Sequence, residues 1–463
     1  MKTAYWLIGL LVCSFSLAAQ PVQDRLARAV EKLQADAQMK HALLGLRVVN
    51  ATTGEKVFEV NAQTGLAPAS CQKIITSAAA LELLGPAYRY ETVLGYTGRI
   101  TRNKLHGDLY LQGSGDPSLG SWRYEPTKED RQLQQVLTLL QQKDIRKMEG
   151  ELIGLAGKWE QETLPGGWIW DDIGNYYGAG SAALNWHENQ YDLVLRSGSA
   201  IGDTVAVVDA RPAPVGVSLQ SQALAAAKGT GDNAYIYLPP FASQGFVRGT
   251  IPVEEKTFVI AGSFPDPAMQ LLSTVNDFLG RSGITPASYR VSYGKTIPGG
   301  QELGKIYSPP LDSLNYWFMR KSINLYGEAF LKTIAFESTG KGSTDKGVEL
   351  VKKFWKERGI EASALRIIDG SGLSPQNRVT ADALVDVLQY ARGRNWFPAF
   401  YEALPLFNQM KLKSGTIGGA KSFAGYHTAK DGTTYTVAII VNNYDGSAGE
   451  MVRKMFQVLD ELK

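Results

Sequence analysis

The sequence predicts a mixed α/β (α+β) fold, in which one antiparallel sheet flanked by helices is built from both ends of the chain. A helix pattern and two strand patterns open the chain, and three strand patterns and a helix pattern close it. Terminal segments that complement each other in this way can complete one sheet. We therefore expect one domain from residues 20–90 and 296–463, with residues 91–295 forming one or more large, β-rich inserted domains.

The opening elements are an amphipathic helix and a hairpin. Residues 24–40 carry apolar side chains at helical spacing. Leu43–Val49 and Lys56–Val60 are apolar-rich runs on either side of the turn-forming segment Asn50–Glu55. This arrangement predicts two strands joined by a tight turn.

A second helix is predicted to begin just after Pro68, where the missing N–H of proline costs little, and to end at Gly85. Ser70 and Lys73 share one face of its first turn. The positive end of the helix favours an anion at the Ser70 hydroxyl and disfavours the ammonium form of Lys73. The pair is therefore a candidate nucleophile with its base.

Simpler interpretations of this pair remain open, because serine and lysine at this spacing are common. A capped surface helix with a solvated lysine fits the same residues. Cys71 is a second candidate nucleophile, but it points about 100° away from Ser70 around the helix. A buried, apolar thiol is the favoured interpretation of Cys71.

The middle of the chain is predicted to contain short strands with two helices. The expected strands are Lys104–Gln112, Tyr235–Leu238 and Gly249–Ile260, and the expected helices are residues 128–142 and 265–283. Four tryptophans cluster in an irregular, glycine-rich region, where loop packing is their favoured role: Trp159, Trp168, Trp170 and Trp186.

The last third of the chain predicts helices followed by strands. Residues 312–336 form a single helix pattern that contains Ser322-Ile323-Asn324, and another helix is expected at 345–358. The loop Asp369–Ser374 is expected to be structural and to shape an edge of the site. The expected later elements are a helix capped by Thr380 and ending near 392, strands at Met410–Thr416, Ser422–Thr428 and Thr434–Asn442, and a helix at 449–462.

Composition excludes several classes of function. The 463 residues carry a net charge of +3 with no long basic run, so nucleic-acid binding is not indicated. The four histidines are scattered, so we expect no metal site. Gly178–Ala183 resembles a dinucleotide-binding loop, but it does not follow a strand, so we expect no dinucleotide site there. A Ser-His-Asp triad stays open, although no G-x-S-x-G motif supports it.

Residues 1–19 have the pattern of a secretory signal. Lys2 precedes the apolar run Ala4–Leu17, which is short for a membrane span, and small residues follow it. Leu10–Cys13 only weakly resembles a lipoprotein site. We therefore expect an exported protein, periplasmic or on the outer face of the cell envelope. Removal of the signal would also remove Cys13 and leave Cys71 without a second cysteine, so no internal disulfide is expected.

Three short motifs stand in a fixed order along the chain. They are Ser70-Cys71-Gln72-Lys73, Ser322-Ile323-Asn324 and Lys413-Ser414-Gly415-Thr416. The same order, S-x-x-K, S-D-N and K-T-G, is found in penicillin-recognising serine enzymes. With the flanking segments Gly107–Pro117 and Asp369–Ser374, the chain resembles the class C low-molecular-mass penicillin-binding proteins. These are the D-alanyl-D-alanine carboxypeptidases and endopeptidases of the peptidase S13 family.

The resemblance covers nearly all of the mature chain and implies a β-lactamase/transpeptidase-like catalytic domain. The large insertion between the first two motifs also fits this family. Three positions depart from its pattern: Ser414 replaces threonine, Ile323 replaces aspartate, and Cys71 lies beside the nucleophile. None of these changes removes a reactive group.

The resemblance also implies a role for each motif residue. Ser70 would attack the carbonyl of the penultimate D-Ala of a peptidoglycan stem peptide, and Lys73 would accept its proton. Ser322 would pass the proton to the leaving D-Ala. Substrate binding would involve Asn324, Lys413, Ser414 and Thr416.

Peptidoglycan stem peptides are thus the expected partners, and β-lactams the expected inhibitors. The resemblance implies no metal or organic cofactor. A serine β-lactamase, a D-amino-acid esterase or amidase on the same fold, and a non-catalytic wall-binding module remain alternatives. The β-lactamase needs a dedicated deacylating group, and the sequence does not point to one.

Overall fold

The computed structural model describes residues 20–463, so the expected signal segment, with Cys13, lies outside the described residues. Its base is a six-stranded sheet in which every pair of neighbours is antiparallel. The strand order is β2 (Lys56–Val60), β1 (Leu43–Asn50), β23 (Thr434–Asn442), β22 (Ala420–Thr428), β21 (Met410–Ile417) and β20 (Leu406–Phe407). The prediction of one sheet built from both ends of the chain is confirmed.

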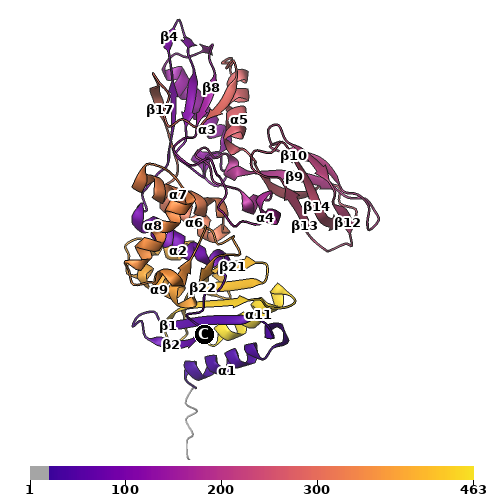
Figure 1. Ribbon diagram of the computed structural model, residues 1–463, viewed down its shortest axis with the longest axis vertical. Coiled ribbons are helices and arrows are strands. Elements are labelled where there is room, and N and C mark those ends of the chain that lie inside the picture. Colours follow the sequence, from indigo (N-terminus) through magenta and orange to yellow (C-terminus); the bar gives the residue numbers. More distant parts are fainter. Residues whose placement is uncertain (1–19) are drawn as a thin grey trace, which may run out of the picture.

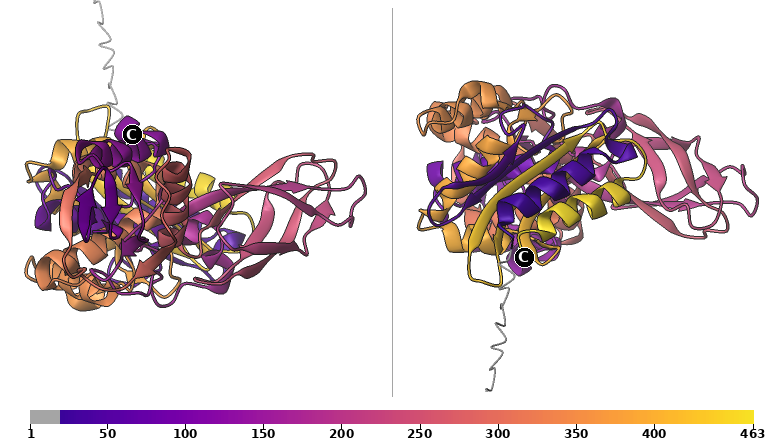
Figure 2. Two further views of the ribbon diagram at one scale, coloured as in Figure 1. Left: turned by 90° about the horizontal axis from the view of Figure 1, so that it is seen from above. Right: turned by 90° about the horizontal axis from the view of Figure 1, so that it is seen from below.

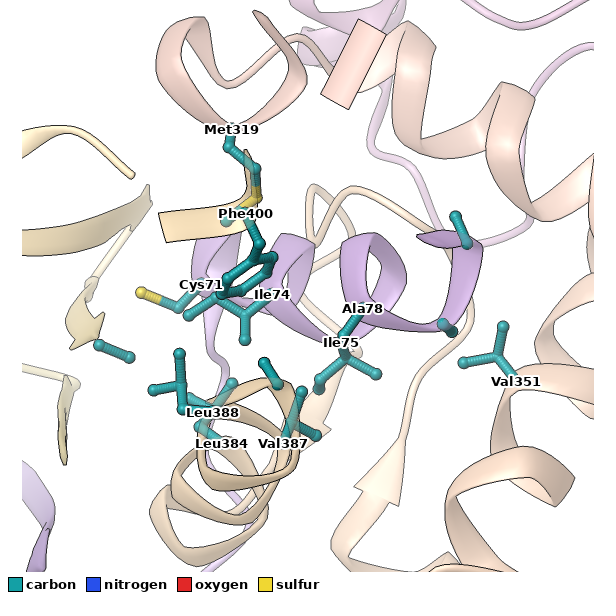
Figure 3. Packing of buried hydrophobic residues seen from close by; sticks show 14 of the residues in the cluster. Cys71, Ile74, Ile75, Ala78, Met319, Val351, Leu384, Val387, Leu388 and Phe400 are labelled. Carbon is teal, nitrogen blue, oxygen red and sulfur yellow. The ribbon is translucent and has the colours of Figure 1, made fainter. Parts of the chain in front are cut away.

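Helices cover both faces of this sheet. On one face, α1 (Val22–Gln34) and α11 (Ala448–Asp460) lie side by side and bury Leu26 and Met455 against the strands (Figure 2). On the other face lie α2 (Lys73–Leu83) and α9 (Ala381–Arg392), and Figure 3 shows Ile74 and Leu388 in their shared core. The Thr380 hydroxyl accepts a hydrogen bond from the N–H of Ala383, which confirms the predicted cap of α9.

A further helical layer packs on α2. It contains α6 (Leu311–Lys321), α7 (Asn324–Thr339), α8 (Thr344–Lys356) and α10 (Phe397–Ala403). The prediction of one helix over residues 312–336 is wrong, because the chain breaks at Ser322, whose φ of 59° is left-handed. A left-handed residue ends an α-helix, so α6 and α7 meet at an angle with Ser322 at the corner.

The insertion begins with an α/β module above the catalytic domain (Figure 1). Its five-stranded sheet has the order β16 (Tyr289–Ser292), β8 (Leu152–Leu155), β6 (Leu109–Gln112), β3 (Glu91–Tyr96) and β17 (Gln301–Tyr307). Helices α3 (Glu129–Gln142) and α5 (Pro267–Arg281) complete its core. Three short strands form a separate small sheet: β4 (Arg99–Thr101), β5 (Lys104–His106) and β7 (Lys147–Met148).

Strand β17 lies beyond residue 295, where the sequence predicts that the insertion ends. It pairs with β3 of the inserted sheet along its whole length. We therefore propose that the insertion continues to Tyr307 and that the catalytic domain resumes with α6.

A second inserted module consists almost entirely of strands and projects sideways (Figures 1 and 2). One sheet contains β10 (Ala206–Arg211), β9 (Gln190–Arg196) and β15 (Phe258–Ser263). The other contains β11 (Ser218–Ser221), β12 (Leu224–Ala226), β13 (Asn233–Tyr237) and β14 (Gln244–Pro252). The single strand predicted over Gly249–Ile260 is wrong, because β14 ends at Pro252 and β15 belongs to the other sheet.

A short helix, α4 (Trp170–Ile173), lies at the junction of this β-rich module with the rest of the molecule (Figure 1). It contacts β13. Among residues 20–463, no helix has both the length and the apolar character needed to cross a membrane.

Candidate active site

Ser70 lies in a single 3₁₀ turn, Ala69–Gln72, that leads directly into α2. The helix predicted to begin just after Pro68 thus starts as a 3₁₀ turn, and α2 itself begins at Lys73. The turn is held from outside by Ser422, whose hydroxyl donates a hydrogen bond of 2.6 Å to the carbonyl of Pro68. Ser70 is half-buried and lines an open cavity.

Lys73 is fully buried and points its amine at Ser70. Its Nζ lies 3.0 Å from Oγ of Ser70, 2.6 Å from Oδ1 of Asn324 and 2.7 Å from the carbonyl oxygen of Ser371. Burial, and then the nearby charge of Lys413, lowers the pKa of Lys73 well below its usual value. An uncharged amine at this position can accept the proton of the Ser70 hydroxyl.

A second buried lysine lies on the other side of the nucleophile. Nζ of Lys413, on β21, donates hydrogen bonds to Oγ of Ser322 at 2.9 Å and to the carbonyl of Ser414 at 2.7 Å. Burial lowers the pKa of Lys413 to about 8. The corner between α6 and α7 therefore places the Ser322 hydroxyl at the cavity wall, within hydrogen-bond distance of the Lys413 amine.

Asn324 is the first residue of α7, and hydrogen bonds fix both ends of its side-chain amide. Its Oδ1 accepts from Lys73, and its Nδ2 donates to the carbonyl of Tyr177 at 2.7 Å. Tyr177 belongs to the insertion. The catalytic domain and the insertion therefore jointly set the orientation of this side chain.

The edge of β21 that faces away from β22 carries free backbone groups beside Ser70. The N–H of Leu412 donates to Pro405 across this edge, and N–H groups two residues apart along a strand point the same way. The N–H of Thr416 therefore points to the same edge, beyond the end of β20. Gly415 allows the close approach, because a Cβ there would lie 2.9 Å from the nitrogen of Ser70.

The structure brings six of the seven predicted site residues together. Ser70, Ser322, Asn324 and Thr416 line the cavity, and Lys73 and Lys413 lie directly beneath it. Ser414 is not among the lining residues, and it contributes its carbonyl to Lys413. Lys421 was missed by the sequence reasoning, although its amine donates to the Thr416 hydroxyl.

The cavity has a volume of about 850 Å³ and lies between the catalytic domain and the insertion. Residues of the insertion that line its far side include Trp122, Arg123, Asp172, Tyr176 and Tyr235. A cleft of this size, with a nucleophile and two buried amines at its base, suits an extended substrate that has an anionic end.

The loop Asp369–Ser374 contributes more to the site than its predicted place at the edge suggests. Its Ser371 carbonyl accepts a hydrogen bond from Lys73. The buried Asp369 carboxylate accepts hydrogen bonds from Gln72, Trp168, Asn377 and the N–H groups of Gly372 and Ser374. This loop therefore ties the floor of the site to the insertion through Trp168.

A second buried carboxylate, Glu328, lies beside this loop and accepts hydrogen bonds from the N–H of Gly370. Burial, followed by the charge of Asp369, raises the pKa of Glu328 to about 8. Sequence alone gave no signal for this group, because a glutamate side chain is almost never fully buried.

Cys71 is buried and turned away from the cavity. Its Sγ donates a hydrogen bond of 3.1 Å to the carbonyl of Lys413, and burial raises the pKa of the thiol to about 11. This thiol stays protonated at neutral pH, as expected for a packing residue. Within residues 20–463, no group of three or more His, Cys, Asp or Glu side chains is placed to hold a metal ion.

Comparison with known proteins gives concordant matches. The model of the D-Ala-D-Ala carboxypeptidase 3 (S13) family matches residues 26–462. The chain is 27% identical to the D-alanyl-D-alanine carboxypeptidase of Actinomadura sp., over 90% of this chain and 81% of that protein. It is 24% identical to the D-alanyl-D-alanine carboxypeptidase DacB of Haemophilus influenzae, over 89% and 87% of the two chains.

The fold has a close counterpart among solved structures. The crystal structure of penicillin binding protein 4 from Haemophilus influenzae superposes with a TM-score of 0.79. The match covers 94% of this chain and 97% of that one, at 22% sequence identity. The architecture, insertion included, is therefore shared.

Proposed function

Because the chain belongs to the D-Ala-D-Ala carboxypeptidase 3 (S13) family, we propose that Ser70, Lys73 and Ser322 carry out its peptidase chemistry. The protein is a serine-type D-Ala-D-Ala carboxypeptidase, a hydrolase of the penicillin-binding class. The observation that carries the assignment of residues is the 3.0 Å hydrogen bond between Ser70 and the fully buried amine of Lys73.

In the acylation step, Oγ of Ser70 attacks the carbonyl carbon of the penultimate D-Ala, and Nζ of Lys73 takes its proton. The backbone N–H groups of Ser70 and Thr416 bind the oxyanion. Each preorganised donor of this kind lowers a barrier by about 3 kcal/mol. The strand geometry of β21 supports this role for Thr416, because its N–H points to the open edge.

Departure of D-Ala requires a proton on its nitrogen. Ser322 passes to this nitrogen the proton that Lys73 took from Ser70, so Lys73 becomes neutral again, and the hydrogen bond from Lys413 holds the Ser322 hydroxyl in place. Lys413 and Thr416 attract the terminal carboxylate, and Lys421 adds a second cation beside Thr416. Ser414, which lies outside the cavity wall, acts only through its carbonyl bond with Lys413. Asn324 binds the backbone amide of the substrate. Water then hydrolyses the ester on Ser70.

A β-lactam presents a reactive amide in the same orientation and acylates the same serine. The amine expelled from the β-lactam stays attached to the acyl group through the opened ring and remains in the site, where it hinders the approach of water, so hydrolysis of the ester is slow. Cross-linked stem peptides are a second substrate of the proposed enzyme, because a cleft of about 850 Å³ has room for a longer leaving group.

The decisive experiment follows the mass of the intact protein after mixing with benzylpenicillin, beside a Ser70→Ala variant. We expect one persistent adduct on the wild-type protein and none on the variant. Release of D-Ala from a peptide that ends in D-Ala-D-Ala is measured next, again beside Ser70→Ala.

Each other outcome identifies an alternative. An adduct that disappears within seconds while penicillin is consumed indicates a β-lactamase. The absence of both an adduct and D-Ala release overturns the assignment of Ser70 and favours a wall-binding module. Hydrolysis of simple D-amino-acid esters without D-Ala release indicates an esterase.

The proposal extends to the place of action. Peptidoglycan lies outside the cytoplasmic membrane, and residues 1–19 have the pattern of an export signal. We place the mature enzyme in the periplasm or on the outer face of the cell envelope. Cell fractionation with an antibody against the protein tests this placement.

A further inference from the structure

A row of aromatic side chains leads out of the catalytic cavity along the β-rich module. It consists of Trp170, Tyr235, Tyr237, Phe246 and Arg248, and we call it the aromatic strip. Tyr235 is opposite Arg248, and Tyr237 is opposite Phe246, in the antiparallel pair of β13 and β14. Residues two apart on a strand share a face, so these four lie on one face of the sheet.

The strip is an ordered stack. The rings of Tyr237 and Phe246 are 5.1 Å apart and nearly parallel, and the Arg248 guanidinium lies 4.3 Å from the centre of the Phe246 ring. Trp170, on α4, lies 5.6 Å from Tyr237 at a tilt of 48°. Two hydrogen bonds fix side chains at the edges of the strip: the Tyr237 hydroxyl donates to Asp171, and Arg248 donates to Gln222.

Its outer rings remain accessible. Trp170 is 43% exposed and Tyr235 is 42% exposed. Exposed aromatic rings gathered on one surface are costly in water and mark a binding site. Tyr235 also lines the catalytic cavity, as does Ile169 next to Trp170, so the strip adjoins the cleft.

We propose that the aromatic strip binds the glycan strand of peptidoglycan while its stem peptide occupies the catalytic cavity. The C–H face of a pyranose ring is apolar and packs flat on an aromatic ring, whereas its hydroxyl groups need polar partners at the rim. Tryptophan and tyrosine rings bordered by Asp171, Gln222 and Arg248 supply both. The inference rests on the proposed peptidase function, which brings a sugar-linked peptide to the adjacent cavity.

The first test compares two substrates that share one stem peptide ending in D-Ala-D-Ala. One is the free peptide, and the other carries the peptide on its amino-sugar disaccharide. For the wild-type protein we expect a higher kcat/KM on the glycan-linked substrate. Trp170→Ala should lower that preference about three- to tenfold while leaving hydrolysis of the free peptide unchanged. Trp170→Phe should retain most of it.

The matched control is Tyr307→Ala, which removes a ring of similar exposure from β17 of the other inserted module. Tyr307 is 50% exposed. It should leave the preference intact. Equal kcat/KM values for the two substrates in the wild-type protein, or a preference that survives Trp170→Ala, overturn the inference while the peptidase function stands. If the wild-type protein hydrolyses neither substrate, the result contradicts the proposed function instead.

A second test removes catalysis. Peptide-free glycan strands are titrated into the Ser70→Ala protein, and binding is followed by calorimetry. We expect binding that weakens at least threefold in Ser70→Ala/Tyr235→Ala and in Ser70→Ala/Trp170→Ala. Binding of stem peptide but not of glycan identifies the strip as part of a peptide groove and overturns the assignment to sugar.

Discussion

Asn324 and Lys73 are joined by a hydrogen bond of 2.6 Å, in which the buried amine donates to the side-chain carbonyl oxygen. The same amide donates to Tyr177 of the insertion, so it cannot turn over without breaking that bond. The neutral acceptor thus orients the amine without supplying the negative charge that would hold a proton on it. The first prediction tests this distinction.

Asn324→Asp places a carboxylate next to Lys73 in nearly the same shape. An adjacent negative charge raises the pKa of an amine by about one to three units. Because Lys73 must be uncharged to act as the base, we expect acylation by benzylpenicillin to slow at least tenfold at pH 7. The rise of the rate with pH should move to higher pH.

Stopped-flow measurement of the acylation rate between pH 6 and pH 10 checks this prediction. Asn103→Asp, an exposed substitution in a turn of the insertion, is the control and should leave the profile in place. An Asn324→Asp profile that coincides with that of the wild-type protein would show that Lys73 is not the base.

Ser322→Ala and Ser322→Gly separate the hydroxyl of Ser322 from its backbone. Both remove the proton donor, so both should lower D-Ala release about 10²- to 10⁴-fold. Since φ is 59°, glycine relieves strain that alanine retains, and Ser322→Gly should be more stable than Ser322→Ala by about 1 kcal/mol. Activity assays and urea unfolding of the two variants measure the two effects. High activity in either variant would remove Ser322 from the mechanism.

Gly415→Ala tests the contact between β21 and the turn that carries Ser70. The added Cβ would lie 2.3 Å from Oγ of Ser422 and 2.5 Å from the carbonyl oxygen of Pro68. Strand and turn must separate, which should cost about 1–3 kcal/mol of stability. A displaced oxyanion site should also lower acylation by about 10²-fold.

The control for this variant is Gly280→Ala on α5, where an added Cβ meets nothing within 4 Å. Alanine inside a helix is favoured over glycine, so this variant should unfold at a slightly higher urea concentration and keep full activity. Wild-type acylation by Gly415→Ala would contradict the proposed oxyanion site.

Lys413→Met tests how burial of the Lys413 amine makes the free energy of unfolding depend on pH. In the folded protein the pKa of Lys413 is about 8, whereas in an unfolded chain it is near 10.4. Between these values the unfolded chain binds more protons, so wild-type stability rises with pH through this window. Lys413→Met lacks this gain. The free energy of unfolding of the wild-type protein relative to Lys413→Met should rise by about 1–3 kcal/mol from pH 7 to pH 10.

Urea unfolding at both pH values provides the measurement. Lys430→Met, which removes an exposed lysine from a turn, should show no such difference. A constant difference between wild type and Lys413→Met at the two pH values would mean that Lys413 keeps its ordinary pKa in the folded protein.

Local sequence patterns predicted the sheet and the motif residues because both depend on short-range signals. Nearly continuous apolar runs predict strands such as β1 and β23, and the Thr380 cap predicts the start of α9. The break at Ser322 was not predictable, since Trp317 and Leu325 continue one helical pattern across it. Tertiary contacts override that pattern.

The buried polar network also escaped prediction for a physical reason. Glu328 and Asp369 become neighbours only when α7 meets the loop Asp369–Ser374, which sequence spacing does not report. Likewise, Lys421 is an ordinary strand residue until pairing places it opposite Thr416. Residues of this kind are found by register and burial rather than by motif.

The interleaving of the two chain ends in one sheet also governs when the enzyme can become active. Strand β1 ends at Asn50, yet its inner neighbour β23 begins only at Thr434, far along the chain. Until β23 arrives, β1 has a bare edge, and β21 with Lys413 has no anchored place beside Ser70. A chain that lacks β23 therefore has neither the partner of β1 nor an anchored Lys413, and it is inert toward the cell wall.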